Sequence, residues 1–207
     1  MPPYRTYIYI DGFNFYYRVV KGTPYKWLDL NSLFTNLLGT KNNILKIKYF
    51  TAIVSGRIDP DQPIRQKTYI RALEKHIPEL EVYYGHFLSH IVDAPLAGKM
   101  PLKFVKIIKA EEKGSDVNLA VHLLNDAWLN KFDCAIIVSN DSDLVEALRI
   151  VKNDLKKVVG LLTPVDNPSM ELKKYSTFIK QIRKGVLSVS QLPDPIPGTN
   201  IYKPKTW

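Results

Sequence analysis

Short apolar runs that alternate with helical stretches are the feature that most constrains the fold of this chain. Cys134–Val138 is apolar at every position, and Val158–Thr163 is apolar apart from one glycine and a final threonine. A strand of this kind must be covered on both faces, as in a parallel sheet flanked by helices. The sequence therefore predicts an α/β fold with a mainly parallel central sheet and helices on both faces.

The same reasoning predicts the remaining elements. Strands are expected over residues 7–10, 44–54, 80–87, 103–109, 134–138, 158–163 and 178–182, and helices over residues 29–38, 59–77, 116–129, 143–151 and 169–175. In the helix over 116–129, apolar residues recur at three- and four-residue steps, which predicts a core-facing stripe. That stripe comprises Val117, Ala120, Val121, Leu124 and Trp128. Residues 89–102 contain two prolines and a glycine and are expected to be a loop.

The length and composition fit one domain with a tail. We expect a single domain over residues 1–190, with an insertion at about 89–109 that forms either a flap over a substrate groove or an extra hairpin. Residues 191–207 contain four prolines and little periodicity, so they are expected to be a mobile tail.

The cysteine content indicates the cellular compartment of the protein, and the net charge indicates the kind of partner that it binds. Cys134 is the single cysteine, so no intramolecular disulfide can form and a reducing compartment is the simpler expectation. The sequence has no signal-peptide pattern and no apolar run of about 20 residues, so a cytoplasmic protein that does not enter a membrane is expected. The 29 Lys and Arg residues exceed the 20 Asp and Glu residues, which gives a net charge of +9 and favours a polyanionic partner.

Four aspartates follow strands or open a helix in the predicted fold. Asp11 follows the first strand, Asp141 and Asp143 follow Cys134–Val138, and Asp116 opens the long helix. Each one alone is explained by a helix cap or a turn. Together they are expected to meet at the carboxyl edge of the sheet, where ligands bind in such folds. Because clustered carboxylates repel one another, the arrangement calls for a cation, and oxygen ligands favour Mg²⁺ or Mn²⁺.

A basic protein with an acidic pit has the charge pattern of a metal-dependent nuclease. Divalent ions held by carboxylates activate water and stabilise a leaving oxygen in phosphodiester hydrolysis. A lysine-rich stretch leads toward Asp116 and could hold RNA, although lysines also protect exposed strand edges, and we weigh the two equally. The lysines are Lys99, Lys103, Lys106, Lys109 and Lys113.

Three motifs together resemble those of NYN domains, a branch of the PIN-like nuclease superfamily that includes LabA-like bacterial proteins. Residues 9–14 (YIDGFN) resemble the opening motif, residues 112–117 (EKGSDV) the central K-G-x-D motif, and residues 138–144 (VSNDSDL) the S-x-D-S-D motif. They occur in family order, and the resemblance covers residues 5–185.

The resemblance implies a Rossmann-like PIN fold, a divalent metal and RNA cleavage. By motif, the metal-binding and catalytic acids would be Asp11, Asp116, Asp141 and Asp143. Asn14 would be a polar residue beside the first acid, and Ser139 a hydroxyl able to bind a carboxylate or phosphate, or a helix cap.

The chain departs from the family pattern at two positions. Asn140 stands where many members have glycine, and His122 stands about where many carry a further acid. The chain therefore either binds one metal or uses Asp126 or Glu112 for a second. RNA is the expected partner, and a homo-oligomer or a protein partner stays open.

Two other functions are weighed against the ribonuclease. A PIN-like module that binds RNA or regulates a partner without cleavage is the main alternative. A haloacid-dehalogenase-type phosphatase is weaker, because its chemistry needs an acid two residues after Asp11, where this chain has Phe13. A dinucleotide-binding fold is weaker still, since no G-x-G-x-x-G follows the first strand.

Overall fold

The computed structural model describes residues 2–57, 59–98, 103–163 and 168–207. A six-stranded sheet with the order β3-β2-β1-β6-β7-β8 forms the centre, and every neighbouring pair in it is parallel. Its strands are β1 (Tyr4–Asp11), β2 (Asn42–Thr51), β3 (Leu80–Tyr84), β6 (Cys134–Val138), β7 (Val158–Thr163) and β8 (Phe178–Gln181). The predicted α/β fold is therefore confirmed.

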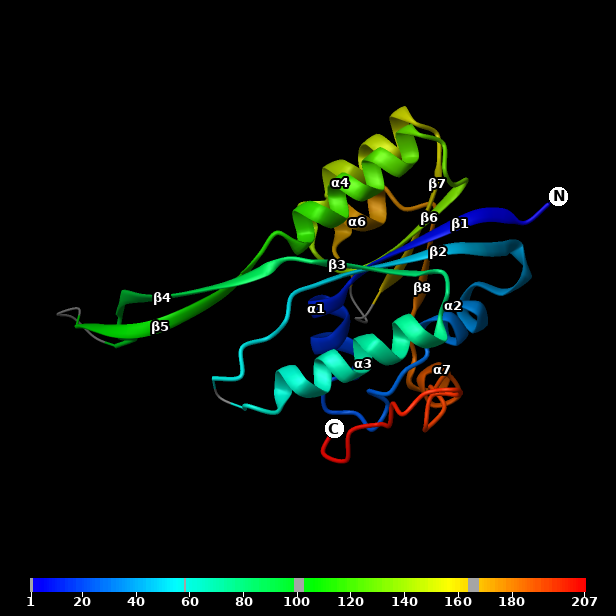
Figure 1. Cartoon of the computed structure of the whole chain (residues 1–207). Helices are drawn as coiled ribbons and strands as arrows, with labels where there is room; N and C mark the ends of the chain where they lie inside the picture. The colour runs from blue at the N-terminus through cyan, green and yellow to red at the C-terminus, as the bar shows by residue number, and fades with distance from the viewer. Residues whose placement is uncertain (1, 58, 99–102, 164–167) are drawn as a thin grey trace.

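Helices cover both faces of this sheet (Figure 1). One face carries α2 (Leu30–Leu38), α3 (Gln62–His76) and α7 (Lys184–Ser188), and the other carries α4 (Ser115–Trp128), α5 (Val145–Arg149) and α6 (Met170–Lys174). The shorter helical segments are α1 (Gly12–Phe15), η1 (Tyr16–Val20), η2 (Gly39–Lys41), η3 (Ser142–Leu144) and η4 (Ile150–Asp154). The helix predicted over 143–151 is thus a succession of 3₁₀, α and π turns. Among the described helices, none has the length and apolar character required to span a bilayer.

The two faces of the sheet build two separate cores, which explains the continuous apolar runs. Along β6, Cys134, Ile136 and Val138 pack into one core, whereas Ala135 and Ile137 pack into the other. Cys134 is fully buried and burial raises the pKa of its thiol to about 12, so it serves as a small hydrophobic residue.

The strand order reverses between β1 and β6. From β1 the chain moves outward through β2 to β3, and then returns to place β6 on the other side of β1. Parallel strands end at the same edge, and a crevice opens where the strand order reverses. The ends of β1 and β6 lie at this edge, so Asp11 and the loop that carries Asp141 lie there too.

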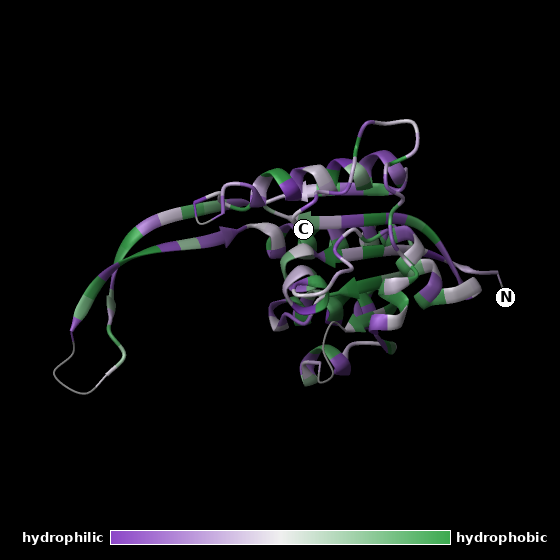
Figure 2. Ribbon diagram, turned by 90° about the horizontal axis from the view of Figure 1, so that it is seen from below, coloured by the Kyte–Doolittle hydropathy of each residue, from purple (hydrophilic) through white to green (hydrophobic). Residues whose placement is uncertain are grey.

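A two-stranded arm leaves the domain between β3 and α4 (Figures 1 and 2). It consists of β4 (His86–Pro95) and β5 (Phe104–Lys113), which pair antiparallel over ten residue pairs. The prediction of a loop over residues 89–102 is wrong for 89–95, which belong to β4. Pro95 is the last residue of β4, so it does not interrupt the pairing of β4 with β5. The insertion is a hairpin, while Lys99 and residues 100–102 lie outside the described part of the chain.

The segment 191–207 packs on the domain, which corrects the expectation of a mobile tail. Leu192, Ile196 and Ile201 are buried in the core that α2 and α3 cover. The ring of Trp207 lies 5.8 Å from that of Trp27 and 5.0 Å from that of Tyr69. The proline-rich segment therefore has no regular secondary structure but is packed closely against the domain.

The core-facing stripe predicted for α4 is confirmed at Ala120 and Leu124, which pack against the core, and is wrong at its other three residues. Val117, Val121 and Trp128 are 66%, 57% and 77% exposed, whereas the buried stripe is Leu119, Leu123, Asp126 and Ala127. A helix with two apolar stripes is ambiguous by periodicity alone. The buried stripe contains the carboxylate of Asp126, and a charged residue in a helical pattern normally indicates the solvent-exposed face.

Asp126 is tolerated in the core because it is fully neutralised there. Its Oδ2 accepts hydrogen bonds from the Lys48 ammonium at 2.5 Å and the Tyr9 hydroxyl at 2.9 Å, and its Oδ1 accepts one from Lys131 at 3.0 Å. Asp126 and Lys48 are 0% and 4% exposed, so this ion pair lies inside the domain, where α4 meets the sheet.

We predict that Asp126→Ala lowers the free energy of unfolding by about 3 kcal/mol, because the buried Lys48 charge keeps only the more distant Glu81, at 3.8 Å, as a partner. Lys131→Ala, which removes a 43%-exposed partner of the same carboxylate, is expected to cost about 0–1 kcal/mol. Urea denaturation of both variants measures the difference, and equal losses would contradict an ion pair that depends on burial.

Candidate active site

Four acidic side chains surround one small cavity at the carboxyl edge of the sheet. Asp11 ends β1, Asp141 follows β6, Asp116 lies in the first turn of α4, and Glu112 lies on β5 at the base of the arm. These residues, with Phe13, Asn14 and Ser115, line a cavity of about 170 Å³. Three separate segments of the chain therefore supply its acids, since Glu112 and Asp116 lie four residues apart.

Asp11 is fixed in place by hydrogen bonds from two neighbours. Its Oδ1 accepts from the backbone N–H of Asn14 at 2.9 Å, which caps α1, and its Oδ2 accepts from the Ser139 hydroxyl at 2.8 Å. Burial raises the pKa of Asp11, against the lowering effect of these hydrogen bonds. Ser139 Oγ also accepts from the backbone N–H of Asp141 at 3.0 Å, so one hydroxyl links the ends of β1 and β6.

Gly12 lets the chain turn sharply after Asp11. A Cβ at this position would lie 2.7 Å from the carbonyl oxygen of Phe50 and 2.9 Å from the Tyr49 ring. Only glycine therefore allows α1 to begin this close to β2.

Glu112 caps α4 and leaves Asp116 free to face the cavity. The Glu112 Oε1 accepts from the backbone N–H of Ser115 at 3.0 Å. Gly114 precedes the helix in the left-handed region, with φ of 95°. The alternative role of Asp116 as a helix cap is thus filled by Glu112.

Like charges at the cavity oppose ionisation of Asp116. Burial, followed by the negative charges of Asp11, Asp141, Glu112 and Asp143, raises the pKa of Asp116 to about 6. Asn14 adds a further unsatisfied group, because its side-chain oxygen is buried and has no hydrogen-bond donor among the described residues. The cavity therefore has an excess of oxygen acceptors and negative charge.

The structure separates some residues that the sequence grouped together. Asp143 is exposed and does not line the cavity, although its backbone N–H donates to Asp141 Oδ1 at 2.9 Å. Asp126, an alternative acid for a second metal, is in the core with Lys48. Within the described ranges, no three His, Cys, Asp or Glu side chains are gathered closely enough to hold a metal by themselves.

The two departures from the family pattern have structural roles. The side-chain oxygen of Asn140 accepts a hydrogen bond from the backbone N–H of Ser169 at 2.8 Å, which ties the loop after β6 to the start of α6. His122 packs against the rings of Tyr83 and Phe50, at 4.0 and 5.6 Å, and does not line the cavity.

The lysines of the arm mostly form ion pairs with acids of the same arm. Lys106 lies 3.6 Å from Asp93, and Lys109 and Lys113 both pair with Glu111. Lys103 precedes β5 and is exposed. Two acids are thus shared among three of the four described lysines, so the ion pairs offset part of the positive charge of the predicted basic stretch.

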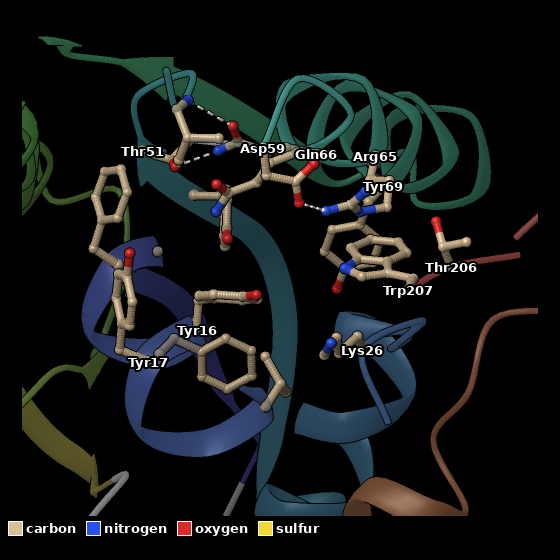
Figure 3. A pocket seen from close by; sticks show the side chains of 17 residues that line it. Tyr16, Tyr17, Lys26, Thr51, Asp59, Arg65, Gln66, Tyr69, Thr206 and Trp207 are labelled. Carbon is tan, nitrogen blue, oxygen red and sulfur yellow. Dashed lines mark hydrogen bonds and ion pairs between the residues drawn. The ribbon is translucent and has the colours of Figure 1, made fainter. Parts of the chain in front are cut away.

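Figure 3 shows a second cavity, which the sequence reasoning missed. It has a volume of about 240 Å³ and is lined by aromatic and polar side chains. Phe13 lines both cavities, and Gly12 lines the second. The run of aromatic residues at 13–17 was the available signal, but the residues opposite it come from distant parts of the sequence.

The sheet order and the acids at the strand ends define an α/β protein of PIN-like architecture. A family model of the NYN domain matches residues 5–183, and the chain belongs to this family. A protein of unknown function from Vibrio parahaemolyticus has a similar fold, with a TM-score of 0.57 and 17% identity over 88% of this chain and 94% of that one.

A curated relative is similar over nearly the whole chain. It is the 6-hydroxy-3-succinoylpyridine 3-monooxygenase HspA of Pseudomonas putida, 36% identical over an alignment of 236 residues that covers 99% of this chain and 76% of the relative.

We predict that Asp116→Asn stabilises the metal-free protein above pH 6. An acid whose pKa rises from about 4 unfolded to about 6 folded costs stability as the pH rises through this window, and asparagine cannot ionise. Because Asp116 is partly exposed, we expect a gain of about 1 kcal/mol, or about 2–4 °C in Tm. Thermal melts in EDTA should show this gain at pH 7.5 and none at pH 3.5; a gain independent of pH would contradict the electrostatic cause.

Proposed function

We propose that this protein is a Mg²⁺- or Mn²⁺-dependent ribonuclease that hydrolyses RNA phosphodiester bonds at the acidic cavity. One observation carries the proposal: Asp11, Asp116, Asp141 and Glu112 surround one small cavity despite their mutual repulsion. Groups with shifted pKa values in a cleft favour a functional site over a structural one. Membership of the NYN family supports the same chemistry.

The residues present fit a hard divalent cation. The available donors are carboxylate oxygens and the unpartnered side-chain oxygen of Asn14, which suit Mg²⁺ or Mn²⁺ better than zinc. Mg²⁺ usually retains several waters and takes only one or two protein carboxylates, so a full cage of acids is not required. When bound, the ion would activate water and stabilise the leaving oxygen.

The side chains of the chain divide the remaining work. Asp11, held by Ser139 and by the backbone of Asn14, has one orientation and would be a metal ligand together with Asp141. Asp116 has a pKa near neutrality and would accept the proton of the attacking water. Asp143 does not line the cavity and would contribute through its negative charge, which helps to raise the pKa of Asp116.

RNA as the substrate rests on the net charge and the family rather than on the arm. The net charge of +9 favours a polyanionic partner, whereas three of the four described arm lysines form ion pairs with acids. A module that binds RNA without cleaving it has the same charge, so only the cleavage assay below separates the two.

A second candidate function follows from the curated relative. Its name specifies oxygenation of a hydroxylated pyridine, and the 36% identity extends over 99% of this chain. The aromatic cavity beside the acids could hold such a ring. Oxygen uptake with 6-hydroxy-3-succinoylpyridine and a two-electron donor tests this candidate directly, and uptake without RNA cleavage would favour it over the ribonuclease.

We predict that Mg²⁺ or Mn²⁺ raises the Tm of the protein. A cation relieves the repulsion in the folded state only, and a concentration ten times its Kd adds about 1.4 kcal/mol, or about 3–5 °C. Asp11→Asn should lose this shift, whereas Glu74→Gln, which changes an exposed acid on α3, should retain it. An unchanged melting curve of the wild type at millimolar metal would contradict a preformed site.

We predict that wild-type protein cleaves labelled single-stranded RNA in Mg²⁺ or Mn²⁺, and that Asp116→Asn and Asp141→Asn each lower the rate about a hundredfold or more. Glu74→Gln is the matched control and should cleave at the wild-type rate. Absence of cleavage by the wild type, or equal cleavage by Asp141→Asn, would refute the ribonuclease.

A further inference from the structure

The second cavity is lined by aromatic side chains on two sides. Figure 3 shows Tyr16 and Tyr17 on one side and Tyr69 and Trp207 on the other. The rings of Tyr16 and Tyr17 lie 5.3 Å apart, and the π-helical segment η1 carries both of them. Aromatic side chains on two sides of a cavity suit a flat ring that packs against them.

Polar groups around the cavity remain available to a ligand. Within the described part of the chain, the side chains of Lys26 and Gln62 form no hydrogen bond, although both line the cavity. Arg65 is held by an ion pair with Asp59 and is 17% exposed. Gln66 is already occupied, since it bonds the backbone of Ala52 and Val54 and so shapes the wall. The free amide of Gln62 and the ammonium group of Lys26 suit a ring that has hydrogen-bonding groups at its edges.

The size of the cavity limits the ligand to one ring system. Its volume of about 240 Å³ lies below the roughly 300–1,000 Å³ of pockets that hold drug-sized molecules. A purely apolar ligand would leave the polar groups unpaired, at a cost in affinity.

The short helix α1 forms the wall between this cavity and the acidic one. Asp11 and Asn14 face the acids, whereas Phe15 faces the aromatic cavity, and Phe13 lines both. The Phe13 ring also packs edge-on against Phe87 of the arm at 5.6 Å. A ligand that extended past Phe13 would therefore reach both cavities.

We propose that the aromatic cavity binds one nucleobase of the RNA strand whose phosphate lies at the acidic cavity. The proposal rests on the proposed function, because it takes the ring and the phosphate to belong to one molecule. Stacking between aromatic rings tolerates any base, so the cavity would position the strand for cleavage without strict sequence preference.

Tryptophan side-chain signals give a direct test. The chain has three tryptophans: Trp207 lines the cavity, Trp27 packs beside it, and Trp128 is exposed on α4 on the opposite face of the sheet. In ¹⁵N-tryptophan protein with EDTA, AMP and UMP should shift the Trp207 indole signal, while the Trp128 signal should not move. Trp→Phe variants assign the three signals.

Matched ligands and variants decide the result. Ribose 5-phosphate should not shift Trp207, since it has no base. Tyr16→Ala and Gln62→Ala should weaken AMP binding, the first about tenfold or more, while Tyr16→Phe and the exposed Tyr202→Ala should bind as the wild type does. An equal shift with ribose 5-phosphate, a shift with 6-hydroxy-3-succinoylpyridine alone, or no shift with any ligand would each overturn the proposal.

Cleavage kinetics separate this proposal from the ribonuclease itself. In the cleavage assay, Tyr16→Ala should raise KM for RNA about tenfold with little change in kcat, the reverse of Asp116→Asn. RNA cleavage without a Trp207 shift would refute the base site and leave the ribonuclease intact. Nucleotide binding at Trp207 without any RNA cleavage would refute the ribonuclease and leave a base-binding cavity.

Discussion

Burial of β1 and β6 on both faces is the constraint on which the rest of the structure depends. Ile8 and Ile10 pack into one core and Tyr9 into the other, so neither face of β1 is open to solvent. A ligand can then reach these strands only at their ends. The reversal of strand order between β1 and β6 brings Asp11 and the loop that carries Asp141 to the same edge. Ser139 joins the two through one hydroxyl.

The two cores differ in how they admit charge. The core under α4 contains the Asp126–Lys48 ion pair, in which opposite charges lie 2.5 Å apart. The acidic cavity is the opposite case, because Asp11, Asp116 and Asp141 line it together and its described lining contains no lysine or arginine. The Asp126–Lys48 pair therefore contributes to stability. The acidic cavity keeps an excess of negative charge, which is typical of a site that binds a cation or another ligand.

The local features of the site could be predicted from the sequence. Asp11 after an apolar strand, Asp116 in the first turn of a helix and the loop after Cys134–Val138 each follow from short-range patterns, and the family motifs place them in one protein. The role of Glu112, the position of Asp143 outside the cavity and the exposed stripe of α4 could not be predicted this way. They depend on which side chains another segment covers, and periodicity carries no information about that segment.

The sequence by itself determined the α/β class, the parallel sheet and the edge at which the acids would meet, because strand burial and strand ends are encoded in consecutive residues. Only the tertiary structure decided what surrounds that edge. It packed residues 191–207 on the domain, extended β4 and β5 as an arm, and formed an aromatic cavity lined by Tyr16 and Trp207. These features join residues up to 191 positions apart, whose contacts arise from packing rather than from any local pattern.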